Sequence, residues 1–185
     1  MQGVVDGQRA VVEGDWRERC GVVMQEGYIF SDTILNNIVV AEDRLDMVRF
    51  REIIRLVQID RFIDSLALSW ETRIGRDGVG VSRGQAQRIL IARALYRDPQ
   101  YIFFDEATSA LDAETESMIV NDLRAALRNK TVVVIAHRMS TVRHADQIIV
   151  LEDGRVVQSG LHAELAAHRG GRYFALIKNQ LELGQ

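Results

Sequence analysis

Uninterrupted apolar runs alternate along this chain with stretches whose apolar residues recur every three or four positions. Such runs are typical of strands buried on both faces of a parallel sheet, and they cover residues 20–24, 101–104 and 131–136. The helical spacing covers residues 43–68, about 84–97 and about 112–127. Pro99 follows the second helical stretch, as expected after a helix end. Strands that alternate with helices predict an α/β fold with a mostly parallel sheet.

Turn residues punctuate both ends of the chain. Near the N-terminus, Val4-Val5 before Asp6-Gly7 predicts a strand end and a turn. Residues 15–19 can form one helical turn, and Thr33 is a suitable residue to cap the next helix. In the C-terminal part, Asp153-Gly154 lies between two apolar segments and predicts a hairpin. Two short helices separated by Gly170-Gly171 are expected after it.

The composition is that of an ordinary soluble protein and indicates which partners to exclude. The chain has 185 residues, 47% of them hydrophobic and 26% charged, which fits one domain or one domain with a small subdomain. A net charge of −3 without a basic patch argues against a nucleic-acid partner. Cys20 is the single cysteine, so no internal disulfide forms and a reducing compartment is expected. The apolar runs are too short to cross a bilayer, although the chain can still dock on a membrane protein.

Polar side chains follow each of the three predicted strands: Gln25, Asp105-Glu106 and His137. In one parallel sheet they would emerge at a single edge, a set suited to hydrolysis of a metal-bound phosphate ester. Asp105 would hold Mg²⁺ and Glu106 would be the general base for the attacking water. Gln25 would position that water or bind the metal, and His137 would reach the terminal phosphate. Alternatively, the acidic pair only favours the start of the next helix, and His137 is a surface or capping residue.

Residues 75–84 are rich in glycine and precede a helix that begins near Ser82 or Gly84. The free N–H groups and the dipole at a helix N-terminus favour a bound phosphate. The alternative is an ordinary serine N-cap, which contributes about 1 kcal/mol to stability. That alternative leaves the glycine density of the loop unexplained.

Four segments, in this order along the chain, resemble the motifs of ATP-binding cassette (ABC) ATPases. GVVMQ resembles the Q-loop and VSRGQAQRILIARAL the signature motif. YIFFDEATSALD, at Tyr101–Asp112, resembles the Walker B strand with its D-loop. VIAHRMSTVRHADQIIVLEDGRVVQSG resembles the switch-histidine region. Four motifs in register over essentially the whole chain are far more specific than a single glycine motif.

The resemblance implies a role for each matching residue in ATP hydrolysis. Asp105 would be the Walker B residue for Mg²⁺, Glu106 the catalytic base and His137 the switch histidine. Gln25 would be the Q-loop residue, acting in catalysis and near the metal.

It also implies contacts with a second nucleotide-binding domain. In this family two such domains pack head to tail around two ATP molecules. Residues that would contact the terminal phosphate of the partner's ATP are Ser82, Gly84 and Gln85. D-loop residues that would line the dimer interface are Ser109, Leu111 and Asp112.

The implied architecture is a P-loop NTPase-like sheet with an inserted helical subdomain. Residues 1–34 and 98–185 would form the α/β core, and residues 35–97 the helical subdomain that carries the signature. The partner domain would be a second copy or a different chain. A transmembrane domain would place the assembly at the cytoplasmic face of the cell membrane, and no nucleic-acid partner is expected.

Two departures from the family pattern are visible. Arg83 stands where the signature usually has glycine. The chain also contains no G-x-x-x-x-G-K-[ST] loop, and its two lysines, Lys130 and Lys178, do not follow a glycine. We therefore expect an N-terminally truncated domain that lacks the first strands and the Walker A loop before the Q-loop. Little or no ATP hydrolysis is expected from this polypeptide alone.

Details of the loops point to the exporter type. ETRIGRDGVGVSRGQ and the C-terminal segment resemble exporter half-transporters, most of all those with peptidase domains or peptide cargo. A peptide or a lipid-like molecule is the expected substrate. Residues 26–40 would form the groove for a coupling helix, lined by Tyr28, Ile29, Phe30 and Ile34 unless these simply pack in the core. Two alternatives remain: a non-hydrolysing remnant or regulatory partner, and a soluble ABC ATPase acting on DNA or ribosomes.

Overall fold

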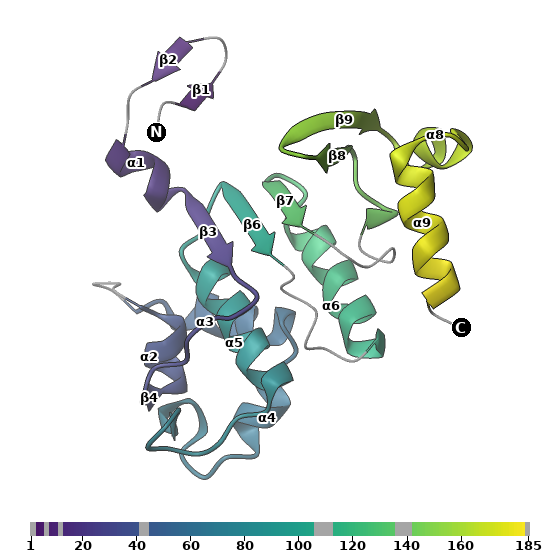
Figure 1. Ribbon diagram of the computed structural model, residues 1–185. Helices are drawn as coiled ribbons and strands as arrows, with labels where there is room; N and C mark the ends of the chain where they lie inside the picture. The colour runs from purple at the N-terminus through teal and green to yellow at the C-terminus, as the bar shows by residue number, and fades with distance from the viewer. Residues whose placement is uncertain are drawn as a thin grey trace. The chain divides into compact units, whose positions relative to one another are not determined.

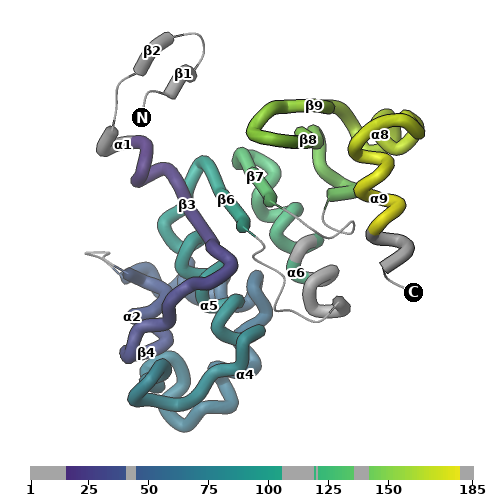
Figure 2. Tube along the Cα trace, in the orientation of Figure 1, coloured from purple at the N-terminus to yellow at the C-terminus, as the bar shows by residue number. Residues whose placement is uncertain are grey.

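The computed structural model describes residues 3–5, 8–10, 13–40, 45–105, 113–135 and 142–183. The chain divides into two compact units, Met1–Ile135 and Ala136–Gln185. Figure 1 shows their helices and strands, and Figure 2 follows the same path by residue number. Each unit has its own hydrophobic cluster.

The first unit contains two kinds of segment, short strands and helices that alternate along the chain. Before the long signature helix the elements are β1 (Gly3–Val5), β2 (Gln8–Ala10), α1 (Glu13–Glu18), β3 (Cys20–Val23), β4 (Asp32–Thr33), α2 (Ile34–Ile38), α3 (Met47–Leu56), α4 (Asp60–Asp64), the 3-10 helix η1 (Ser69–Glu71) and β5 (Arg73–Ile74). From the signature helix onward they are α5 (Arg83–Tyr96), β6 (Tyr101–Asp105), α6 (Ala113–Ala126) and β7 (Thr131–Ile135).

The central sheet consists of β3, β6 and β7 in that order, and both pairings are parallel (Figure 1). Val23 at the end of β3 pairs with Phe104, and Asp105 at the end of β6 pairs with Ile135. The predicted α/β fold with a parallel sheet is confirmed. The carboxyl ends of the three strands therefore lie together at one edge of the sheet.

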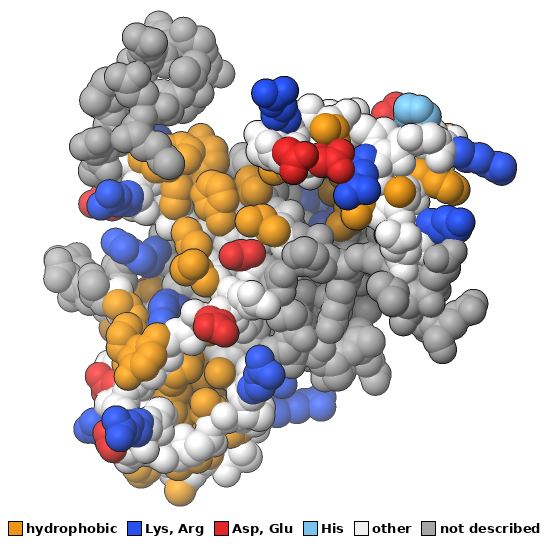
Figure 3. Space-filling view, viewed as in Figure 1, with side chains coloured by type: hydrophobic (Ala, Val, Ile, Leu, Met, Phe, Trp, Pro, Cys, Tyr) orange, Lys and Arg blue, Asp and Glu red, His pale blue; other side chains and the backbone are white. Residues whose placement is uncertain are grey.

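Burial in the sheet is one-sided, so the prediction of strands buried on both faces is wrong. Along β6, Ile102 and Phe104 are buried, whereas the residues between them are only partly buried. The buried pair belongs to one cluster with side chains of α5 and α6 such as Leu95 and Ile119. On the other face, Val22 is 56% exposed, and β7 is exposed along its length. Figure 3 shows hydrophobic side chains gathered on the surface over β3 and β6.

The predicted helical stretch at 43–68 forms two helices in the described part, α3 and α4. Asp46 caps α3, because its carboxylate accepts hydrogen bonds from the backbone N–H groups of Val48 and Arg49. Phe50 is fully buried against the rest of the core. The chain then turns at Gln58, whose φ of 54° is incompatible with a continuous right-handed helix. Helix α4 begins two residues later.

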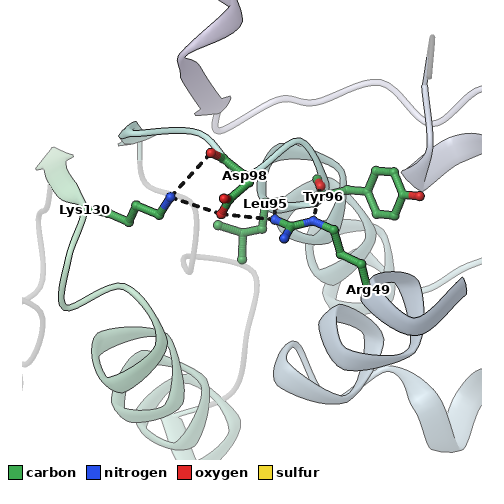
Figure 4. Close-up of polar contacts among 5 residues, drawn as sticks. All are labelled: Arg49, Leu95, Tyr96, Asp98 and Lys130. Carbon is green, nitrogen blue, oxygen red and sulfur yellow. Dashed lines mark hydrogen bonds and ion pairs between the residues drawn. The ribbon is translucent and has the colours of Figure 1, made fainter. Parts of the chain in front are cut away.

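A polar cluster fixes the C-terminal end of α5 (Figure 4). Arg49 of α3 donates to the backbone carbonyls of Leu95, at 2.9 Å, and of Tyr96. Asp98 pairs with Arg49 at 3.3 Å and with Lys130 at 3.0 Å, and the bond from Lys130 is the main reason why the pKa of Asp98 is lowered. The last carbonyls of α5 are thus satisfied by a cation, which is favourable at this pole of the helix dipole.

The second unit is a hairpin with two helices. It contains β8 (Ile148–Glu152), β9 (Arg155–Gly160), α8 (His162–Ala167) and α9 (Arg172–Leu183). Asp153 and Gly154 both have positive φ, 50° and 74°, as the turn of a two-residue hairpin requires. The predicted hairpin and the two C-terminal helices are confirmed. Across the described residues, no helix has the length and apolar character needed to cross a bilayer.

Candidate functional site

Gln25 and Asp105 meet at the carboxyl edge of the central sheet. Asp105 is the last residue of β6, and Gln25 follows the end of β3 by two residues. Because β3 and β6 are paired in parallel, the two positions share the edge that sequence analysis predicted. Gln25 is exposed and Asp105 is half-buried. The other predicted residues of this edge and of the D-loop lie outside the described residues: Glu106, Ser109, Leu111, Asp112 and His137.

The donor set at this edge fits Mg²⁺. Mg²⁺ prefers oxygen ligands and is usually held by one or two carboxylates together with waters and phosphates. Asp105 supplies one carboxylate, and the side-chain amide of Gln25 supplies a neutral oxygen nearby along the edge. The described part of the chain contains no cluster of three or more histidine, cysteine or acidic residues, which separates this edge from a zinc-type site.

The predicted signature loop leads into a fully formed capping box at the start of α5. Ser82 accepts a hydrogen bond at 3.2 Å from the backbone N–H of Gln85, and the Ser82 N–H donates at 2.8 Å to the Gln85 side chain. The structure confirms that Ser82 caps the helix. Contact of Ser82, Gly84 and Gln85 with a phosphate stays a prediction. Arg83 is exposed, so the side chain that replaces the usual glycine points to solvent without displacing core residues.

Helix α5 is joined near its start to the turn after α3. The Arg88 guanidinium donates at 2.7 Å to the carbonyl of Gln58 and at 3.3 Å to that of Gly84. Gln58 is the residue whose positive φ ends α3. The position of the signature helix is therefore set by the fold of the helical segment.

Two of the loop glycines have structural reasons. Gly75 has a φ of 94°, and a Cβ on it would lie 2.9 Å from the carbonyl oxygen of Phe30. Gly78 packs its Cα against the backbone of Arg73, where a side chain would collide. Gly80, by contrast, has open space around it. The loop does approach other backbone closely, as predicted, and at Gly75 and Gly78 that backbone belongs to the same chain.

The segment 26–40 is divided between core and surface. Ile34 is fully buried and Ile29 packs against the core, as the alternative interpretation expected. Tyr28 is 68% exposed, and its ring meets that of Phe30 edge-on with the centroids 5.4 Å apart. Beside them lies an open hollow of about 300 Å³, and the residues that line it are Phe30, Asp32, Asn36, Val39 and Val40.

Sequence analysis missed a pair of polar residues that hold this segment, Asn37 and Arg93. Asn37 is fully buried, although it lies on the short helix α2. Arg93, in the last turn of α5, donates to Asn37 and to the carbonyl of Tyr28. A polar residue between the apolar Leu35 and Ile38 was the one available signal, since buried polar groups must find partners.

Comparisons with known proteins extend these observations. Residues 3–109 match the family described as ABC transporter. The chain is 40% identical, over 98% of its length, to the toxin RTX-I translocation ATP-binding protein of Actinobacillus pleuropneumoniae. It is 43% identical, over 89% of its length, to ABC transporter B family member 14 of Arabidopsis thaliana. A solved bacterial Atm1-family ABC exporter with ATP bound superposes with a TM-score of 0.88 at 36% identity, over 96% of the chain.

The chain spans a part of these relatives. It covers 26% of the Actinobacillus protein, 13% of the Arabidopsis protein and 32% of the Atm1-family exporter chain. The matched residues include the central sheet up to Asp105 and the whole of helix α5. The chain belongs to the ABC transporter family and is similar to its exporter-type members.

Proposed function

We propose that this chain is the ATPase component of an ABC exporter and couples ATP binding and hydrolysis to movement of a substrate across a membrane. The observation that carries the proposal is the shared sheet edge of Gln25 and Asp105, in a chain whose relatives include translocation ATP-binding proteins. The Actinobacillus relative translocates a toxin by its name, and this favours a peptide over a lipid-like substrate. A peptidase-containing exporter is part of the same proposal.

In the proposed reaction, each side chain at the sheet edge has a separate task. Asp105 holds the metal, Gln25 orients the attacking water, and Glu106 accepts the proton of that water. His137 donates a hydrogen bond to the terminal phosphate. Bound Mg²⁺ supplies charge neutralisation of the phosphate oxygens. Ser82, Gly84 and Gln85 at the start of α5 bind the terminal phosphate of an ATP held by a second nucleotide-binding domain.

The proposed partners are that second domain, as an identical or a different chain, and a transmembrane domain at the cytoplasmic face of the membrane. The exposed rings of Tyr28 and Phe30, with the hollow beside them, would receive a helix of the transmembrane domain. Residues 1–185 contain no Walker A loop, so we propose that this polypeptide alone hydrolyses ATP very slowly.

The test isolates the assembly that contains the chain. An affinity tag after Gln185 is used to purify, from detergent-solubilised native membranes, whatever carries or binds these residues; we call this the tagged assembly. ATP hydrolysis by the tagged assembly is expected, with a loss of at least about 100-fold in Glu106→Gln. Glu152→Gln, which removes a surface carboxylate paired with Arg172, is the matched control and should leave turnover unchanged.

Three outcomes would contradict the proposal. Hydrolysis that is insensitive to Glu106→Gln would remove the assigned base. An assembly that binds ATP without hydrolysing it would favour the remnant or regulatory alternative. Recovery of the chain only from soluble complexes with DNA or ribosomes would favour the soluble ABC ATPase. Robust turnover by the purified 185-residue polypeptide, insensitive to Glu106→Gln, would contradict the expectation of slow hydrolysis by the chain alone.

A further inference from the structure

We propose that Arg93 is a positioning residue, which together with Asn37 holds residues 25–33 in the single conformation that presents Gln25 and the Tyr28–Phe30 surface. The functional meaning of this role rests on the proposed function, because it concerns the Q-loop residue and the docking surface of an exporter ATPase. The structural part of the proposal stands on the contacts of the described residues alone.

Arg93 uses all sides of its guanidinium toward this segment. Its Nε donates to the carbonyl of Asn37 at 2.7 Å, and one Nη donates to the Asn37 side-chain oxygen at 3.0 Å. The other Nη donates to the carbonyl of Tyr28 at 2.9 Å. The guanidinium carbon also lies 4.7 Å from the centre of the Phe30 ring. Such a planar fork joins several acceptors at once in a way that lysine cannot.

Asn37 completes the connection from below. Its side-chain oxygen accepts from the N–H of Phe30 at 2.8 Å, and its NH₂ group donates to the carbonyls of Phe30, at 3.0 Å, and Thr33, at 2.9 Å. The asparagine is fully buried, and the arginine is half-buried, so both sets of bonds are sheltered from water. Polar groups in such surroundings are costly to leave without partners. The backbone at Tyr28, Phe30 and Thr33 is therefore tied to α5 and α2.

Hydrophobic burial does little to fix the same segment. Residues 24–28 are exposed, and Phe30 is 43% exposed. A loop that buries little apolar surface has to be ordered by specific polar contacts, since ordering each residue has an entropic cost. In the described residues, the Arg93–Asn37 pair supplies most of these contacts for Tyr28 and Phe30.

The arrangement also links two parts of the proposed site through one rigid helix. Arg93 lies in the last turn of α5, and Ser82 caps its first turn. The 14 residues of α5 form a rod of about 21 Å. A partner that displaces Tyr28 or Phe30 would therefore move the helix whose other end carries the signature residues.

Hydrogen exchange of the 185-residue chain tests the positioning role. Arg93→Lys keeps the charge but removes the fork, and peptides covering residues 25–33 are expected to exchange at least about tenfold faster, the effect of losing one bond from a charged donor. Arg88→Lys is the matched control in the same helix, and it should instead accelerate exchange around Gln58. In both variants the buried amides at Ile89–Ala92 should keep their protection.

Uniformly faster exchange throughout the first unit in Arg93→Lys would show a general stabilising role and overturn the proposal, as would unchanged exchange at residues 25–33. Asn37→Asp is a second variant, which keeps the acceptor for Arg93 but removes the two donors to Phe30 and Thr33. It should accelerate exchange of the same peptides, and if Arg93→Lys does not fold, this result decides the matter.

Turnover of the tagged assembly gives the functional readout. Arg93→Lys should lower kcat for ATP at least about fivefold with KM unchanged, because the nucleotide-binding residues stay in place while Gln25 loses its fixed position. A higher KM with unchanged kcat would contradict the positioning role. If exchange responds as expected but the wild-type assembly does not hydrolyse ATP, the proposed function fails and the role of Arg93 in ordering the loop stands.

Discussion

Replacing Arg49 by methionine should destabilise the first unit more than any exposed charge on it would suggest. Arg49 donates to the carbonyls of Leu95 and Tyr96, and it pairs with Asp98 (Figure 4). Methionine preserves most of the apolar stem but removes every donor. The carbonyls at the end of α5 are then left without the cation that satisfies them.

The magnitude follows from the exposure of each contact. A hydrogen bond from a charged donor contributes about 1.5–3 kcal/mol when it is well buried. The Arg49 side chain is 31% exposed, so we take the lower end of that range for each of its two carbonyl contacts. The Asp98 side chain is 65% exposed, and its pairing adds no more than about 0.5 kcal/mol. The free energy of unfolding should fall by about 3 kcal/mol in Arg49→Met.

Urea denaturation followed by tryptophan fluorescence measures this change. Trp16 and Trp70 are the only tryptophans and both lie in the first unit, so the signal reports on that unit. Asp98→Asn serves as the control that removes only the ion pairs, with an expected loss of about 0.5 kcal/mol. If Arg49→Met costs no more than Asp98→Asn, the carbonyl contacts do not stabilise α5 and the reasoning is refuted.

Three further predictions concern the loop, the sheet and the acidic end of α5. Gly75→Ala should lower the free energy of unfolding by about 2 kcal/mol because of its positive φ and the nearby carbonyl, whereas Gly80→Ala, in open space, should change it by less than about 0.5 kcal/mol in the same urea assay; equal effects would contradict the strain. Ile102→Ala should cost about 3–4 kcal/mol and Val22→Ala less than about 1 kcal/mol, and comparable losses would show that both sheet faces are buried. The pKa of Asp98 is lowered in the folded chain, so its stabilising contribution is complete above the unfolded value of about 3.9 and disappears as the pH falls through the folded pKa; the small stability difference between wild type and Asp98→Asn should vanish in this acid range, and a difference that grows there would have the wrong sign.

Sequence patterns predicted the order and type of the main elements because those depend on local periodicity and turn residues. The run at Tyr101–Phe104 became a parallel strand, Ser82 became an N-cap, and Asp153-Gly154 became a hairpin turn. The meeting of Gln25 and Asp105 also followed from strand direction alone. The roles of both residues in catalysis stay predictions.

Long-range contacts were beyond the reach of such patterns. Arg93 looks like any charged residue near the end of a helix, and only the fold brings it to Tyr28 and Asn37. The one-sided burial of the sheet was equally hidden, since a continuous apolar run does not reveal whether one or two faces are covered. At Gly75 the composition predicted a close approach, but its partner, the carbonyl of Phe30, lies far away in the sequence.

Strand β7 has a consequence for how this polypeptide behaves at high concentration. Its sequence, TVVVI, is uncharged and β-branched throughout, it is exposed, and it forms one edge of the three-stranded sheet of the described residues. An exposed apolar edge strand is a template for pairing with another copy of itself. Purified residues 1–185 should therefore self-associate through β7 as concentration rises, and a single lysine at Val133 would act as a gatekeeper that keeps the molecules apart.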